Sequence, residues 1–194
     1  METDANTNRA ESFKEKAELA LNGADQSASI GSYGLMEAQL EEARINSRMA
    51  NEFGIPVPKI EDRIRNTQRK GYTTAIMIAK NNATRFAENG DKELMEQELS
   101  IVRHCLTQIG LGNTIEEEEK PIRNFIKIAD IYRLLDILGS AINKENYPEK
   151  QREFEQLKNE ARQLGIKPDN DANFKRAELF LRFYALKRYL NTPA

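Results

Sequence analysis

Apolar residues recur along most of the chain at spacings of three and four, with charged and polar residues between them. This is the period of an α-helix, and the alternation typical of a strand is absent from the pattern. The clearest stripe consists of Met95, Leu99, Val102, Leu106 and Ile109. Asp91 before this stripe is a suitable N-cap, and Gly110 after it fits a left-handed C-terminal cap. The pattern predicts a helix from Asp91 to Ile109 and an all-α fold.

The same reasoning predicts about seven antiparallel helices in one domain. Their expected ranges are 11–24, 33–53, 58–88, 91–109, 115–142, 148–164 and 171–190. Ser12 and Thr114 begin capping-box patterns for the first and fifth helices, and Asn170 or Asp171 caps the last one. Residues 1–9 and 191–194 are polar and aperiodic, so we expect a disordered N-terminus and a frayed C-terminus around a single domain at 10–190.

Three of these helices end in an apolar residue, a glycine and another apolar residue. The glycines are Gly54, Gly110 and Gly165, at intervals of 56 and 55 residues. The segment 35–40 (LMEAQL) also matches 94–99 (LMEQEL). These matches favour a degenerate repeat of helical hairpins, an α-solenoid-like arrangement. The alternative is a compact helical bundle whose helices end alike because glycine caps are common.

The hairpins and glycine stops resemble α-solenoid proteins, of which tetratricopeptide repeats are the best-known kind. The interval here is much longer than the tetratricopeptide period of about 34 residues. The chain also contains no tryptophan, which that repeat uses. The resemblance therefore extends to the hairpin architecture and not to that family.

The sequence also predicts how two of the helices pack. Gly71 lies inside the helix at 58–88, where a glycine indicates either a bend or a close approach of a neighbouring helix. The helix at 115–142 has apolar residues over much of its circumference, which predicts that it is the central and most buried element. Its two rows are Phe125, Ile128, Tyr132, Leu135, Gly139 and Ile142, and Ile122, Ile126 and Leu134.

Composition narrows the class of protein. The 194 residues include 29 basic and 31 acidic side chains, so the chain lacks the strong positive charge of many nucleic-acid binders. No apolar run is long enough to cross a bilayer, and the first residues do not form a signal peptide. We expect a cytoplasmic protein without membrane contact. Its single cysteine, Cys105, cannot form an intrachain disulfide.

Local catalytic and metal-binding motifs are missing. His104 is the only histidine, so two-histidine zinc motifs are excluded. Neighbouring Cys105 points elsewhere on the helix, so we interpret Cys105 as a core residue and His104 as solvent-facing. The four acids 116–119 begin a helix, where they complement its dipole. We expect no catalytic residue, no cofactor and no metal site.

Two clusters of residues are candidates for binding a partner. In the last helix, surplus aromatic and basic residues extend beyond the row that a bundle would bury (Phe174, Ala177, Leu181 and Tyr184). The candidates in this helix are Phe180, Phe183, Tyr189, Arg182, Lys187 and Arg188. A second, basic cluster lies in the third helix and consists of Arg63, Arg65, Arg69 and Lys70.

These features favour a non-catalytic protein-interaction module that acts as an adaptor, scaffold or chaperone-like binder. A protein partner or self-association is expected. The first alternative is a nucleic-acid-associated protein that uses the basic clusters at 59–70 and 175–188, because arginine and aromatic side chains can stack on bases. The second is an enzyme whose carboxylates assemble across helices.

Overall fold

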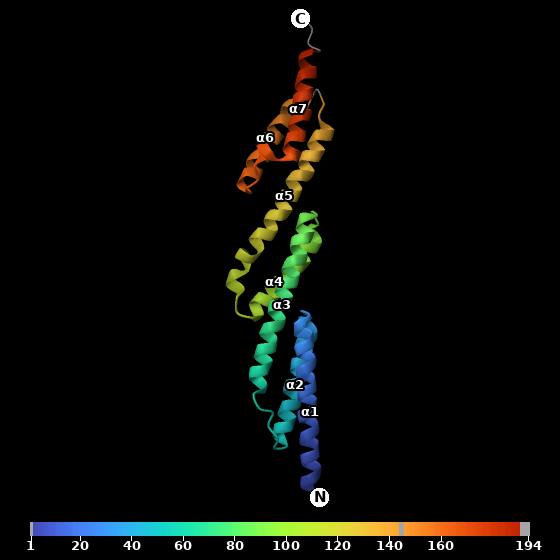
Figure 1. The fold of residues 1–194 in the computed structure, drawn as a ribbon, viewed down its shortest axis with the longest axis vertical. Coiled ribbons are helices and arrows are strands. Elements are labelled where there is room, and N and C mark those ends of the chain that lie inside the picture. The colour runs from blue at the N-terminus through green and yellow to red at the C-terminus, as the bar shows by residue number, and fades with distance from the viewer. Residues whose placement is uncertain (1, 144–145, 191–194) are drawn as a thin grey trace. The chain divides into compact units, whose positions relative to one another are not determined.

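The computed structural model describes the backbone of residues 2–143 and 146–190, and the side chains of 6–143 and 146–186. The fold is all-α: the described chain is 87% helical, and no strand occurs among the described residues. The α-helices are α1 (Glu2–Ser29), α2 (Tyr33–Glu52), α3 (Ile60–Glu88), α4 (Lys92–Gln108), α5 (Ile115–Ala141), α6 (Tyr147–Gln163) and α7 (Ala172–Leu190). Figure 1 shows α1 beside α2 as a helical hairpin, and α6 and α7 beside the later part of α5.

The first helix is much longer than the sequence predicted. It begins at Glu2 and not near Glu11, so Ser12 lies inside it and not at its cap. It also continues through the segment expected to be a loop, because Ala24, Ser27 and Ala28 are all buried there. The Ser27 hydroxyl donates a 2.7 Å hydrogen bond to the Gln39 side chain of α2, which stabilises this last turn of α1.

The three predicted glycine stops are confirmed. Gly54, Gly110 and Gly165 have φ angles of 87°, 77° and 81°, a region that glycine enters without steric penalty. In each stop the amide of the next residue donates to a carbonyl five residues back, as in the 2.8 Å bond from Leu111 to Leu106. This geometry closes the helix and places an apolar side chain after it.

Long and short helices alternate along the chain, as a repeat of two helices per unit would produce. The odd helices α1, α3 and α5 have 28, 29 and 27 residues, and the even helices α2, α4 and α6 have 20, 17 and 17. Burial repeats as well, at an interval of 55 residues through α3, α5 and α7. Three positions are buried in each of these helices. In the order α3, α5 and α7, the first position is Ile64, Glu119 and Phe174, the second is Thr67, Ile122 and Ala177, and the third is Gly71, Ile126 and Leu181.

The contacts divide the described chain into two compact units. Unit 1 comprises residues up to Ala83 together with Leu94–Glu119, and unit 2 comprises Thr84–Glu93 together with the chain from Lys120 onward. Helices α3, α4 and α5 therefore contribute residues to both units. The expectation of a single domain at 10–190 stays a prediction.

The core of unit 1 is built from small residues and closely spaced helices. Gly71 of α3 is buried, and a Cβ atom added there would lie 2.2 Å from the sulfur of Met36 and 3.2 Å from Cβ of Ala28. Both neighbours are themselves fully buried. Of the two explanations that the sequence offered for Gly71, the structure supports the close approach of neighbouring helices.

The core of unit 2 lies between α5, α6 and α7. It contains Ile131, Leu135, Leu138, Ile142, Phe154, Leu157, Ala161, Phe174, Ala177 and Leu181. The expectation that α5 is buried over most of its circumference is wrong. Phe125, Leu134 and Ile137 are 38%, 43% and 51% exposed, because α6 and α7 cover one stripe of α5 and leave its other apolar side uncovered.

Candidate protein-binding surface

The C-terminal helix α7 is anchored at its first turn. Asp171 caps it as predicted, since the amides of Asn173 and Phe174 donate to the Asp171 carboxylate at 2.9 and 3.3 Å. The hydroxyl of Tyr132 on α5 donates to the other oxygen of the same carboxylate at 2.9 Å. Burial and this hydrogen bond raise the pKa of Tyr132. One side chain thus fixes the start of α7 and ties it to α5.

The inner face of α7 is the apolar row that the sequence predicted. Phe174, Ala177 and Leu181 are at most 4% exposed, and Tyr184 is half-buried against them. The ring of Phe174 lies 6.0 Å from the ring of Phe154 on α6. Aromatic burial of this kind holds α7 firmly against its hairpin neighbours.

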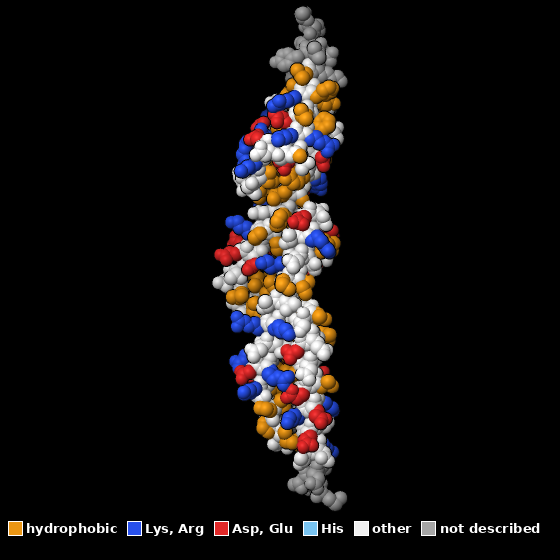
Figure 2. Space-filling view, in the orientation of Figure 1, with side chains coloured by type: hydrophobic (Ala, Val, Ile, Leu, Met, Phe, Trp, Pro, Cys, Tyr) orange, Lys and Arg blue, Asp and Glu red, His pale blue; other side chains and the backbone are white. Residues whose placement is uncertain are grey.

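The outer face of α7 is also apolar. Leu179, Phe183 and Leu186 share one side of the helix and are 67%, 60% and 63% exposed. Hydrophobic side chains are visible along this end of the chain in Figure 2, which shows the molecule in the orientation of Figure 1. We call Leu179, Phe183 and Leu186 the α7 outer row. Its exposure agrees with the prediction that this helix carries more apolar surface than its own core uses.

Phe180 lies between the two faces of α7. It is 39% exposed, and its ring covers Gly139 of α5, whose added Cβ would lie 3.1 Å from the ring. A shallow pocket between α5 and α7 adjoins this contact. It is lined by Leu135, Asp136, Gly139, Ser140, Asn173, Arg176, Ala177 and Phe180. Phe180 therefore contributes to packing as well as to the surface.

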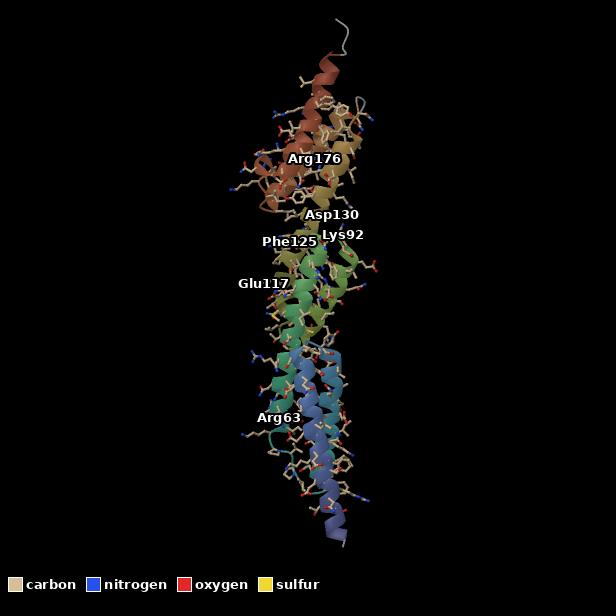
Figure 3. All side chains as sticks on the ribbon, turned by 45° about the vertical axis from the view of Figure 1, so that its right-hand side comes forward. Arg63, Lys92, Glu117, Phe125, Asp130 and Arg176 are labelled. Atoms are coloured by element: carbon tan, nitrogen blue, oxygen red, sulfur yellow. The ribbon has the colours of Figure 1, made fainter. Side chains whose placement is uncertain are left out.

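The basic residues of α7 flank the outer row. Arg182 forms a 2.7 Å ion pair with Glu178 of the same helix, and Arg176 (labelled in Figure 3) lies 3.9 Å from Asp136 of α5. All four of these side chains are more than one-third exposed, so these pairs leave the charges open to solvent. The side chains of Lys187, Arg188 and Tyr189, also candidates, lie outside the described residues.

The second predicted cluster, on α3, belongs to unit 1, and its charges are mostly engaged there. Arg63 (Figure 3) pairs with Glu18 of α1, and Arg65 pairs with Asp62 at 2.7 Å. The ammonium of Lys70 donates to the Ser29 hydroxyl at 2.9 Å. Arg65 and Arg69 also line a polar pocket with Gln68, Tyr72, Gln108 and Ile109. The pairs with acids reduce the positive charge that this cluster presents to an anion.

Sequence reasoning missed a group of titratable side chains in unit 1. The Tyr72 hydroxyl donates to Glu37, whose carboxylate also lies 3.9 Å from Nε2 of His104. The His104 ring is 5.3 Å from the Tyr33 ring and is exposed, as predicted. Cys105 is fully buried, also as predicted. Glu37 belongs to α2, Tyr72 to α3 and His104 to α4. These side chains meet because the three helices pack together, and the apolar pattern of a single helix does not reveal that packing.

The four acids 116–119 do more than begin α5. Glu118 forms an ion pair with Lys80, and buried Glu119 pairs with Arg103. Glu116 and Glu117 are exposed in the first turn, as the dipole interpretation predicts. Among the described residues, no group of three or more His, Cys, Asp or Glu side chains has the arrangement of a metal site.

The chain matches no protein-family model, no curated protein and no solved structure. Within the described ranges, no helix has the length and hydropathy needed to cross a membrane. Of the α7 outer row, Phe183 is the member that the sequence also named as a candidate, and it is 60% exposed.

Proposed function

We propose that this protein is a non-catalytic interaction module that binds another protein through α7. The observation that carries the proposal is the α7 outer row, in which Leu179, Phe183 and Leu186 are each at least 60% exposed on one side of a capped helix. Contiguous apolar surface rimmed by charge is the usual mark of a protein-binding site. An adaptor, scaffold or chaperone-like role fits this arrangement.

The charge distribution supports a protein partner over nucleic acid. The formal net charge of the chain is −2, and Arg63 and Arg65 of the α3 cluster pair with acids of their own unit. Nucleic-acid binding draws its affinity from unpaired lysine and arginine side chains aimed at phosphates. Our proposal places the activity in the cytoplasm, where the free thiol of Cys105 would stay reduced.

The test is selective loss of a native partner. The 194-residue chain is used to capture its partner from the native cell after nuclease treatment, and the capture is repeated with a Phe183→Ser and Leu186→Ser variant. Hot-spot residues of an interface usually contribute more than about 1 kcal/mol each, so the double variant is expected to lose the partner. The matched control is Leu19→Ser with Ile45→Ser, because these residues of α1 and α2 are 73% and 51% exposed.

Two outcomes would overturn the proposal. The first is a partner retained equally by the α7 variant and lost by the control variant. The second is binding of a generic oligonucleotide at micromolar concentration or tighter that Arg182→Glu abolishes. Such binding would weaken about a thousandfold between 50 and 200 mM salt if about six phosphates were contacted.

A further inference from the structure

Unit 2 carries a second apolar surface, on α5. Leu134, Ile137 and Ala141 follow each other at spacings of three and four, so they share one side of this helix. All three are exposed, Leu134 by 43% and Ile137 by 51%. We call Leu134, Ile137 and Ala141 the α5 outer row. Unit 2 thus presents an exposed apolar row on α5 as well as the one on α7.

The α5 outer row continues into an open groove between α5 and α6. Leu134 lines this groove together with Ile131 of α5 and Leu164 at the end of α6, and these three residues form its apolar lining. The polar lining consists of Lys127, Asp130, Glu160 and Gln163. A groove of this kind accepts one face of a helix, because the side chains of one helix pack between those of its neighbours.

The α6 edge of the groove is acidic. On this side of α6, polar residues follow each other at spacings of four and three: Glu149, Glu153, Gln156, Glu160 and Gln163. We call these five residues the α6 polar row, and it contains no basic residue. Glu149 and Glu160 are exposed, and Glu153 pairs with Lys150 at 2.8 Å. Carboxylates therefore border the apolar α5 outer row.

The charges on the α5 edge of the groove are partly engaged with each other. Asp130 pairs with Lys92 at 2.7 Å, both labelled in Figure 3, and with Arg133 at 3.4 Å. The lining of the groove holds two carboxylates, Asp130 and Glu160, and one ammonium group, that of Lys127. One negative charge is therefore in excess, and the α6 polar row supplies it.

The α7 outer row has the properties that this groove requires. Its three residues are apolar at spacings of four and three, and Lys175 and Arg182 are exposed beside them on one flank. Lys175 and Arg182 are seven residues apart, as are Glu153 and Glu160 of the α6 polar row. The whole of α7 has five basic residues and one acid. Its shape and charge both match the groove.

We infer that the α7 outer row of one copy of this chain docks in the groove between α5 and α6 of another copy. This inference rests on the proposed function and names its partner. The docked helix buries Phe183 and Leu186 against Leu134 and Ile137, and its basic flank faces the carboxylates of α6. The contact joins two different surfaces, so each copy binds one neighbour through α7 and another through its groove. Such a head-to-tail contact produces chains or rings of copies.

A copy cannot fill its own groove with its own α7. Phe180 of α7 covers Gly139 of α5, and Gly139 lies about 140° around that helix from Leu134, at 3.6 residues per turn. The α7 outer row is also on the side of α7 opposite to Phe174 and Leu181, which pack in the core with α5 and α6. Both surfaces therefore face away from the core of unit 2, where a neighbour can reach them.

Charge favours this pairing over the two symmetric ones. Two α7 helices packed face to face would bring their basic flanks together, and two grooves packed face to face would bring their α6 carboxylates together. Like charges oppose both contacts, whereas α7 in the groove places opposite charges side by side. A partner of acidic character would suit α7 and be repelled by the groove. A second copy satisfies both surfaces.

Two variants of the 194-residue chain test the inference. The α7 variant carries Phe183→Ser with Leu186→Ser, and the groove variant carries Leu134→Ser with Ile137→Ser. Sedimentation velocity at several concentrations measures the association of each variant alone and of the two mixed. Thermal melts check that the variants are folded, which exposed positions such as these permit.

The unchanged chain is expected to form oligomers whose size increases with concentration. Each variant alone should associate at least about tenfold more weakly, because it lacks one of the two surfaces. An equimolar mixture should form a one-to-one complex and nothing larger, since α7 of the groove variant fits the groove of the α7 variant. The matched control, Leu19→Ser with Ile45→Ser, should associate like the unchanged chain, because those exposed residues lie on α1 and α2.

Charge reversal tests the basic flank separately. Lys175→Glu with Arg182→Glu should weaken association, and so should Glu153→Lys with Glu160→Lys, because each change places like charges side by side. A chain that carries all four substitutions should regain part of the association, since the opposite charges are restored with their positions exchanged. Loss that is simply additive in this chain contradicts the contact between α7 and the α6 polar row.

Other results overturn the inference. A chain that stays monomeric up to about 100 μM lacks the contact. Association that only the α7 variant loses makes two α7 helices the interface, and a mixture of the variants that stays monomeric excludes the head-to-tail arrangement. If the chain is monomeric while the α7 variant still loses its partner in the capture experiment, the partner is a different protein and the proposed function stands. If that partner is retained as well, both fall.

Discussion

The guanidinium of Arg103 on α4 holds both carboxylate oxygens of Glu119 on α5. Its Nε donates to one oxygen and its Nη2 to the other at 3.1 Å, while Nη2 also reaches Glu96 at 3.0 Å. The hydrogen bond to Glu119 is the main cause that raises the pKa of Arg103. Glu119 is only 6% exposed, so Arg103 supplies hydrogen bonds and opposite charge to a buried carboxylate.

Arg103→Met is therefore expected to lower the free energy of unfolding by about 1–3 kcal/mol, because it removes two hydrogen bonds and the opposite charge from a buried carboxylate. The matched control is Arg65→Met, which breaks an ion pair with Asp62 whose side chains are 71% and 64% exposed. That change should cost at most about 1 kcal/mol. Urea denaturation measures both variants, and equal losses would contradict the buried role of Glu119.

The sequence predicted local features of this region and missed the long-range ones. The run of four acids predicts the start of a helix, because acidic side chains in the first turn stabilise the helix through its dipole, and this interaction involves only residues close together in the chain. Nothing in the run shows that Glu118 and Glu119 meet Lys80 and Arg103, since those pairs depend on how three helices pack. For the same reason the contact of Tyr72 with Glu37 could not be foreseen.

Helix ends and stripes were predicted well where one residue decides them. Gly110 ends its helix with a positive φ, and Asp171 begins its helix by accepting hydrogen bonds from two backbone amides. Each feature depends on a few consecutive residues, so the local sequence is enough to predict it. The burial of α5 was predicted poorly, because periodicity marks apolar faces without showing which face a neighbour covers. Exposed Leu134 and buried Leu135 look alike in the sequence. Of the α7 outer row the sequence singled out only Phe183, because an excess of apolar residues in a helix does not show which of them stay exposed.

Gly71 offers a test of the close approach inside unit 1. Gly71→Ala is expected to destabilise the protein by about 1–3 kcal/mol, since the added methyl group overlaps the buried Met36 side chain. Gly34→Ala is the matched control, because Gly34 lies in α2 with no atom within 4 Å of the added Cβ. That variant should be neutral or stabilising by up to about 1 kcal/mol.

Combining Gly71→Ala with Met36→Ala tests whether the loss of stability in Gly71→Ala comes from steric overlap with the Met36 side chain. If the overlap with Met36 is responsible, adding Met36→Ala to Gly71→Ala should cost less than Met36→Ala alone. Equal unfolding midpoints for the Gly71→Ala protein and the unchanged chain would show that the helices do not approach as closely as described.

Adjacent leucines on α5 test the uneven burial of that helix. Leu135→Ala is expected to cost about 2–5 kcal/mol, because this 2% exposed side chain fills the core of unit 2. Leu134→Ala should change stability by no more than about 0.5 kcal/mol, since Leu134 is 43% exposed. Similar losses in urea denaturation would mean that both sides of α5 are covered in solution.

The buried thiol of Cys105 makes stability depend on alkaline pH. Burial, with a smaller effect from the charge of Glu37, raises the pKa of Cys105 from 9.0 to about 11. Because the unfolded chain ionises first, the stabilisation from the neutral thiol is complete below pH 9 and is lost as the pH rises toward 11. Burial and the hydrogen bond to Glu37 raise the pKa of Tyr72 as well, which acts in the same direction.

The free energy of unfolding should therefore fall between about pH 8 and pH 11, and less steeply in a Cys105→Ala variant that removes the thiol. At about pH 8 the folded protein should react with a thiol reagent at least a hundredfold more slowly than the urea-unfolded chain, because the thiolate is scarce and shielded. Rapid, stoichiometric labelling of the folded protein would show instead that Cys105 is accessible, and the packing of α4 against α2 and α3 would have to be revised.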